Sequence, residues 1–310
     1  MTTAPTTTGA GTPGAAGPAT APASAPAAPR PARRAPGERA RRALLTCGVA
    51  AVILYCLAPF YWMLVSSLRR TSDIFEKSPW PSPVSFENYT AVFKPEQGFG
   101  RALLNSLIVA GTTTLCALLL ATFTAYAVAR LDFRFKRAIM SAVIAMSMFP
   151  VVSIVVPLLR FFTDIGWINT YQAMIVPSMS FALPLAVWNL TVFFRQLPEE
   201  LEQAAMVDGC TRGQAFRRIM LPLAAPGVFT TAIITFIAAW NEFLIALSMT
   251  NKSDLQTATV AISKFTGATT FETPFGSQMA AGVLVTVPLV IMVVLFQRRI
   301  VAGLTAGSAK

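Results

Sequence analysis

The chain has 310 residues, of which 54% are hydrophobic and only 13% carry a charge. That balance excludes an ordinary soluble domain and is typical of a protein with several membrane-spanning segments. The formal net charge of +11 comes from basic residues at the ends of apolar segments, not along one polar face, which indicates membrane topology rather than nucleic-acid binding.

The N-terminal tail is the first feature along the chain. Residues 1–36 are mostly Ala, Pro, Thr and Gly, with almost no large apolar side chain. Such a segment cannot bury enough surface to offset the entropy of ordering, so we expect it to be disordered. It lacks the early apolar core of a signal peptide. An arginine cluster follows, and residues 1–42 are predicted to form a cytoplasmic tail.

Six apolar segments follow the tail, each about 20 residues or more, which is long enough to cross the hydrocarbon core of a bilayer. They predict an all-α integral membrane protein with a six-span domain over residues 43–300 and a C-terminal tail over 301–310. The approximate spans are 43–68, 103–129, 138–161, 172–194, 228–250 and 277–297.

The loops between the spans predict the orientation. One set, which includes both ends of the chain and residues 197–222, carries 17 of the 25 Lys and Arg residues, against 8 in the other set. The positive-inside rule therefore places the first set in the cytosol. The loops over about 69–102 and 251–276 are expected to face outward.

Prolines interrupt several spans, and each removes a helix hydrogen bond and favours a kink. Two interpretations stay open, a static bend for packing and a hinge between two open states. The prolines concerned are Pro59, Pro150, Pro157, Pro177, Pro184 and Pro288.

A charged segment over residues 197–222 separates the fourth and fifth spans. Pro198 suits the first turn of a helix, and the glutamates after it complement the helix dipole. Gly209 is placed to end that helix in a left-handed conformation. Thr211 and Gln214 predict a capping box that opens a second helix. We therefore expect a helix–turn–helix finger on the cytosolic surface.

Leu201, Ala204 and Ala205 place an apolar, small-residue stripe at helical spacing on this finger. A short helix with such a face can dock in a groove of a partner protein. The alternative is an amphipathic helix that only lies on lipid, which does not explain the Ala-Ala, Gly and Leu-Pro punctuation.

The finger resembles a loop in the inner-membrane permease subunits of ABC importers. That loop reads Glu-Ala-Ala, three residues, Gly, nine residues, Ile, one residue, Leu-Pro. The spacing matches throughout, and the single departure is a Gln where the motif has Glu, which puts in doubt a specific salt bridge from that position. The matching residues are Gln203, Ala204, Ala205, Gly209, Ile219, Leu221 and Pro222.

The resemblance covers about residues 43–310 and is greatest to the carbohydrate branch, of the maltose and trehalose type. Residues 221–248 and 297–310 are similar to that branch, and residues 265–277 to trehalose-type permeases in particular. The resemblance implies a type I ABC importer permease fold with cytoplasmic coupling helices. It also implies a location in the cell membrane and transport of a disaccharide such as trehalose or maltose.

The resemblance further implies that the chain works with a second permease subunit, two copies of an ATP-binding subunit and an extracytoplasmic sugar-binding protein. In the family, the loop sits in a cleft of the ATPase. The implied ATPase-coupling residues are Glu202, Gln203, Ala204, Ala205, Asp208, Gly209, Ile219, Leu221 and Pro222. In maltose-type members the C-terminal tail also reaches the ATPase, which implies a contact at Gly303, Leu304 and Thr305.

The chain itself has no Gly-x-x-x-x-Gly-Lys-Ser/Thr motif, so it cannot cradle a nucleotide in that way. We expect it not to be an enzyme, with ATP and Mg²⁺ bound by partner subunits. The sequence contains no histidine, and its four cysteines lack metal-ligand spacing, so no metal site is predicted.

Glu242 is the only acid deep inside a predicted span, and such a costly charge is a candidate for function. With Trp240 and Asn241 it could line a sugar pathway. The alternative is a helix-packing contact in which Glu242 is hydrogen-bonded to a neighbouring span, and both interpretations stay open.

Two other functions compete with the importer subunit. An ion-coupled secondary transporter needs titratable groups at the membrane midplane, and one glutamate with no histidine supports it poorly. A membrane scaffold that recruits a cytosolic protein through the finger would bind a partner without moving solute.

Overall fold

The computed structural model describes residues 36–265 and 274–306, with side chains over 41–265 and 274–297. The predicted tail over 1–35, and residues 266–273 of the trehalose-type segment, lie outside the described residues. Regular structure within the described ranges is helical throughout. The α-helices are α1 (Pro36–Ser67), α2 (Glu87–Val92), α3 (Phe99–Arg130), α4 (Lys136–Ser147), α5 (Val151–Asp164), α6 (Tyr171–Gln196), α7 (Glu199–Val207), α8 (Arg212–Ala215), α9 (Leu221–Trp240), α10 (Leu244–Met249), α11 (Ala258–Ser263) and α12 (Phe275–Ala306).

The chain divides into two compact units, residues 1–54 and 55–310. The described part of the first unit is helical from Pro36, so the last arginines of the basic cluster lie on α1. The second unit holds the remaining helices and every site described below.

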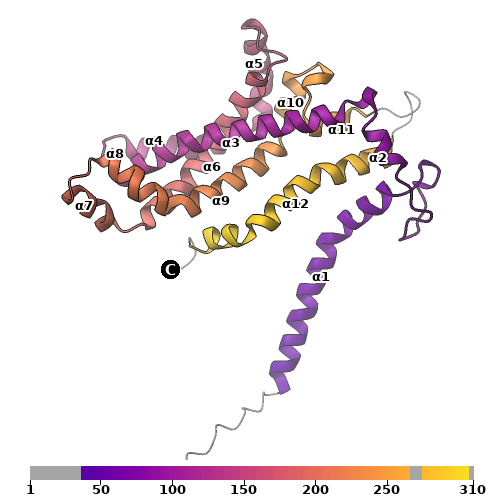
Figure 1. The fold of residues 1–310 in the computed structure, drawn as a ribbon, viewed down its shortest axis with the longest axis horizontal. Coiled ribbons are helices and arrows are strands. Elements are labelled where there is room, and N and C mark those ends of the chain that lie inside the picture. Colours follow the sequence, from indigo (N-terminus) through magenta and orange to yellow (C-terminus); the bar gives the residue numbers. More distant parts are fainter. Residues whose placement is uncertain (1–35, 266–273, 307–310) are drawn as a thin grey trace, which may run out of the picture. The chain divides into compact units, whose positions relative to one another are not determined.

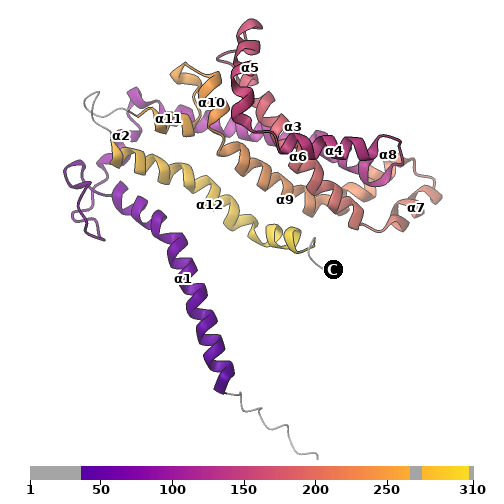
Figure 2. The same ribbon diagram turned by 180° about the vertical axis from the view of Figure 1, so that it is seen from behind.

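Three long helices, α3, α6 and α9, form the centre of the second unit and lie side by side (Figures 1 and 2). Their contact faces carry small residues, with Ala117, Ala121 and Ala125 of α3 fully buried. On α9, a Cβ on Gly227 would lie only 2.3 Å from the ring of Phe193 on α6. Small side chains let these backbones approach closely, as is usual between helices in a membrane.

Five described helical segments are long and apolar enough to cross a bilayer, and a bent pair would make a sixth if it is counted as one span. The pair is α4 and α5, which meet at 93° where one continuous span over 138–161 was predicted. Pro150 precedes the first residue of α5, and a proline disfavours helical geometry at the residue before it. Here a proline makes a sharp bend rather than a mild kink.

The predicted span over 228–250 is also interrupted. Helix α9 ends at Trp240, and the short helix α10 begins at Leu244. The residues on both sides of the break are mostly apolar, so hydropathy alone does not predict the interruption.

The non-spanning segments gather at opposite ends of α3. Helices α7 and α8 lie near its C-terminal end, while α2 and α11 lie near its N-terminal end (Figures 1 and 2). Helix α12 begins beside α2 and runs along α9 toward the end that holds α7. Its backbone stays helical to Ala306, so its C-terminal end lies on the same side of the bundle as residues 197–222.

Candidate functional site

The finger, residues 197–222, turns a tight corner after α7. Gly209 has a φ of +88°, in the left-handed region. The amide of Cys210 donates to the carbonyl of Ala205 at 3.0 Å, and the amide of Gly209 donates to the carbonyl of Met206 at 3.1 Å. These two bonds form a Schellman ending. The predicted left-handed glycine is confirmed.

The second arm of the finger opens with the predicted capping box. Thr211 Oγ1 accepts from the Gln214 amide at 3.3 Å, and Gln214 Oε1 accepts from the Thr211 amide at 2.8 Å. The helix then passes through a π-helical turn, in which the Leu221 amide bonds to the Phe216 carbonyl. Pro222 has no amide hydrogen and its ring crowds the preceding turn, which a widened turn accommodates. The second arm is thus continuous with α9 rather than a separate helix.

One face of α7 is apolar and exposed. Leu201, Ala204 and Val207 recur every three residues on it, and Val207 is 87% exposed. Ala205, which was predicted to share this stripe, is buried against the bundle instead. The apolar face that a partner could reach is therefore made by Leu201, Ala204 and Val207.

The other predicted coupling residues divide between surface and core. Gln203, Asp208 and Pro222 are exposed. Ile219 and Leu221 are half-buried and pack against the core cluster of α3, α6 and α9. The motif therefore combines residues that a partner could touch with residues that fix the finger to the bundle.

Glu202 belongs to the second group. Its side chain is buried, and its Oε1 accepts a hydrogen bond of 2.6 Å from the Tyr126 hydroxyl on α3. The ring of Tyr126 also packs on Phe216 of the second arm, with centroids 4.5 Å apart. Sequence reasoning missed Tyr126 because its partner lies 76 residues away in the chain.

The three candidates for a sugar pathway do not form one polar site. Trp240 is buried, stacks on Phe236 with centroids 5.6 Å apart, and packs in a cluster with Ala110. Asn241 is exposed, and its Nδ2 donates to the Ile237 carbonyl of its own helix at 2.8 Å. Trp240 therefore supports the bundle from inside.

The Glu242 side chain caps a helix and also lines a cavity. Its carboxylate accepts from the amides of Ile245 at 2.7 Å and Ala246 at 3.0 Å, which caps the start of α10. It also lines a cavity of about 220 Å³ together with Thr235 and Ser178. The packing alternative placed the partner of Glu242 on a neighbouring span, whereas these bonds stay within the predicted span 228–250. Apart from Glu242, Thr235 and Ser178, the residues that line the cavity are apolar.

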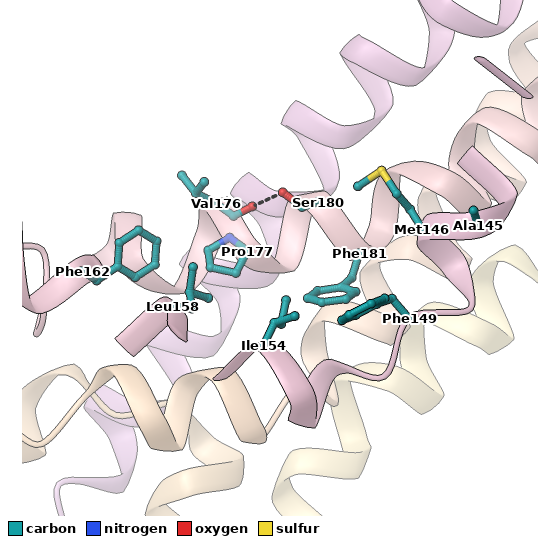
Figure 3. A pocket seen from close by; sticks show the side chains of 10 residues that line it. All are labelled: Ala145, Met146, Phe149, Ile154, Leu158, Phe162, Val176, Pro177, Ser180 and Phe181. Carbon is teal, nitrogen blue, oxygen red and sulfur yellow. Dashed lines mark hydrogen bonds between the residues drawn. The ribbon is translucent and has the colours of Figure 1, made fainter. Parts of the chain in front are cut away.

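A larger hollow, of about 420 Å³, lies at the bend between α4 and α5 and against α6. Figure 3 shows the rings of Phe149 and Phe181 and the side chains of Ile154 and Leu158 around it. The Ser180 hydroxyl, the one polar side-chain group in its lining, donates to the Val176 carbonyl of its own helix at 3.0 Å. The lining is apolar and gives a sugar few hydrogen-bonding partners.

In the part of the chain with described side chains, no group of three or more Cys, Asp and Glu residues could hold a metal ion. The predicted contact at Gly303, Leu304 and Thr305 lies on the last turns of α12, but the side chains of these residues lie outside the described ones. Residues 307–310 of the predicted tail are also outside them.

Comparison with known proteins finds one matching family and several chains of similar sequence. Residues 116–305 match the family described as "Binding-protein-dependent transport system inner membrane component". The trehalose transport system permease protein SugB of Mycobacterium tuberculosis is 46% identical, over 84% of this chain and 94% of its own. The trehalose/maltose transport system permease protein MalG of Thermococcus litoralis is 42% identical, over 88% of this chain and 98% of its own.

A solved structure shares the fold. A chain of a bacterial ABC transporter that imports the acidic polysaccharide alginate superposes with a TM-score of 0.71 at 17% identity, over 87% of this chain and 99% of that one. This likeness concerns the fold. On the family match and the two relatives, the chain belongs to the family of inner membrane components of binding-protein-dependent transport systems.

Proposed function

We propose that the chain is a translocation subunit of an ATP-driven importer for a disaccharide such as trehalose or maltose. It forms the pathway with a second permease subunit, and an extracytoplasmic sugar-binding protein delivers the substrate. Two ATP-binding subunits hold ATP and Mg²⁺, and this chain carries out no covalent chemistry. The names of the two relatives support the choice of sugar.

The observation that carries the proposal is the exposed apolar face of α7. Leu201, Ala204 and Val207 form a patch on a short helix that a Schellman corner and a core-packed second arm hold in place. A preformed helix with such a face suits a groove in a partner protein, because little ordering entropy is lost on docking. In the proposed complex that groove belongs to the ATPase.

The proposed orientation places both chain ends and the finger in the cytosol. The excess of Lys and Arg in those segments supports it. The course of α12 toward the finger side is also consistent with a second ATPase contact at Gly303, Leu304 and Thr305.

We place the sugar pathway along the α9 surface near Glu242. The cavity with Thr235 and Ser178 supports this position, because hydroxyl and carboxylate groups suit sugar hydroxyls. Asn241 is exposed at the end of α9, and Trp240 would act from the core by holding that end in position.

The test is co-purification followed by transport. The tagged chain is extracted in mild detergent, its partners are identified, and uptake of labelled trehalose and maltose is measured in proteoliposomes. We expect a stoichiometric ATPase and a second permease. We also expect Gly209→Asp to stop ATP-dependent uptake while the protein stays in the membrane. An exposed charge at the corner would oppose docking without disturbing the core.

Other outcomes identify the competing functions. A chain that purifies alone and whose uptake depends on an ion gradient is a secondary transporter. A chain that binds a cytosolic partner without any solute flux is a scaffold. Normal ATP-dependent uptake in Gly209→Asp would contradict the proposed role of the finger.

A further inference from the structure

Arg130, the last residue of α3, is the centre of an ionic network in which Arg130 and Glu202 are buried and the Glu199 side chain is 71% exposed. Its side chain is only 4% exposed. Its Nη1 lies 3.2 Å from Glu199 Oε1, and its Nε lies 3.8 Å from Glu202 Oε2, both on α7. Its Nη2 donates to the carbonyl of Leu197, the residue that follows α6. One guanidinium group therefore joins the ends of three helices.

Tyr126 extends this network one turn back along α3. It lies four residues before Arg130, so the two side chains share a helix face. Its hydroxyl donates to Glu202 Oε1, while Arg130 faces Oε2 of the same carboxylate. Its ring packs on Phe216 and on Phe194, with centroids 4.5 and 5.8 Å apart. Tyr126 thus contacts both arms of the finger.

The attachment of α7 depends on few groups. Only Glu202 and Ala205 of this helix are buried, and Ala205 contributes a single methyl group. A buried carboxylate is stable only when it is paired and hydrogen-bonded. The Glu202 carboxylate accepts a hydrogen bond from Tyr126 and lies 3.8 Å from Arg130 Nε, so Tyr126 supplies its hydrogen bond and Arg130 its countercharge.

The other end of α3 is fixed to a different segment. The Asn105 Nδ2 donates to the carbonyls of Asp254 at 2.8 Å and Gln256 at 2.9 Å. Ser106 Oγ accepts from the amide of Ala258 at 2.8 Å. Polar side chains at both ends of one 32-residue helix therefore hold the finger and the segment before α11.

We propose that Arg130, together with Glu202 and Tyr126, is a positioning residue that makes α7 and α3 move as one body. A displacement of α7 by the ATPase would then pass directly into α3, and through Asn105 to the outward segment. The exposed Gln203 stands at the position of the motif Glu, and its neighbour Glu202 makes the ion pair with Arg130. This inference rests on the proposed docking of α7 to an ATPase.

The first test compares Arg130→Gln with the wild type in the complete complex, reconstituted with ATPase, second permease and binding protein. The measured quantities are membrane abundance, recovery of the ATPase, and sugar imported per ATP hydrolysed. We expect the assembled variant to import about tenfold less sugar per ATP, within the usual range of coupling between sites. Tyr126→Phe keeps the ring packing and should lower the ratio less.

The matched control is Arg134→Gln, which removes an exposed positive charge four residues later. It should leave the ratio unchanged. An unchanged ratio in assembled Arg130→Gln would overturn the proposal. If the wild-type chain recruits no ATPase at all, the proposed function fails instead, so the two failures are distinguishable.

A second test does not depend on whether Arg130→Gln assembles. Spin labels are placed at Val207 on α7 and Phe123 on α3, both exposed, after the four native cysteines are changed to serine. We expect the distance between the labels to stay the same in the nucleotide-free and ATP-bound complexes. A change in that distance would show that α7 moves independently of α3 and would overturn the proposal.

Discussion

At one end of α3, Asn105 holds the segment before α11 with neutral hydrogen bonds, whereas at the other end Arg130 holds α7 with ion pairs. The Asn105 side chain acts as donor and acceptor at once, because its Oδ1 also accepts a hydrogen bond of 2.7 Å from the Tyr171 hydroxyl. Arg130 instead shares its charge between Glu199 and Glu202. The two ends therefore differ in the chemistry of attachment.

The two segments differ in burial as well. The segment from α10 to α11, residues 244–263, buries apolar side chains, among them Ile245, Met249 and Val260. Helix α7 buries only Glu202 and Ala205. Segments with few buried apolar contacts open at lower free energy than the core. The comparison indicates that the segment from α10 to α11 is part of the packed core, while α7 is attached mainly through the polar contacts of Glu199 and Glu202.

The largest effect should come from Asn105→Ala, which removes the hydrogen bonds to the segment before α11. The fully buried Asn105 side chain makes three hydrogen bonds, and the Gln256 carbonyl in particular would lose its partner in a buried position, at a cost of about 2–3 kcal/mol in total. Hydrogen exchange over residues 250–263 should rise, and the thermal midpoint in detergent should fall.

Asn241→Ala is the matched control, since that side chain is exposed and bonds only within its own helix. It should change neither measurement. If Asn105→Ala left exchange over 250–263 unchanged, this segment would be held by its apolar contacts alone.

Gly227→Ala tests the bundle that both ends share. The added Cβ would lie 2.3 Å from the Phe193 ring, so α6 and α9 must separate or the ring must turn, at about 1–3 kcal/mol for overpacking. Gly111→Ala is the control, because no atom lies within 4 Å of its Cβ position. The thermal midpoint should fall for the first variant only, and equal midpoints would show that the α6–α9 contact adapts freely.

Gly209→Val tests the corner of the finger without crowding it. No atom lies within 4 Å of the added Cβ, but the φ of +88° is strained for a β-branched residue. The cost should be about 1–2 kcal/mol, seen as faster hydrogen exchange over 199–215. Gly209→Asn should change exchange less, because asparagine tolerates left-handed geometry, and equal exchange in both variants would show that the corner is not conformationally demanding.

Local rules predicted the finger well. Gly209 and the Thr211–Gln214 capping box depend on neighbours within a few residues, so their geometry can be derived from the sequence. Five of the six predicted spans correspond to long apolar helices, because length and hydropathy are read directly from the sequence, and the sixth is the bent pair α4 and α5. The motif spacing then identified the family, which the comparisons confirm.

Features that depend on distant partners were not predicted. The stripe of Leu201, Ala204 and Ala205 was placed on one face, but Ala205 turns inward because Glu202 is drawn to Tyr126. The interruption near Glu242 was missed as well, since an apolar sequence continues on both sides of it. A glutamate in such a run is itself a sign that backbone amides need an acceptor, which is the role it has here.

Thr211→Ala should give the smallest effect. It tests whether the two arms of the finger open independently of each other. The Thr211 side chain caps the second arm from an exposed position, so its loss should cost about 1 kcal/mol or less. Exchange should rise at Gln214, while the α7 residues held by Arg130 stay protected. Thr211→Ser keeps the capping oxygen and should match the wild type. If α7 lost protection in Thr211→Ala, the finger would open as one piece, and the ion pairs of Arg130 would not hold α7 independently of the second arm.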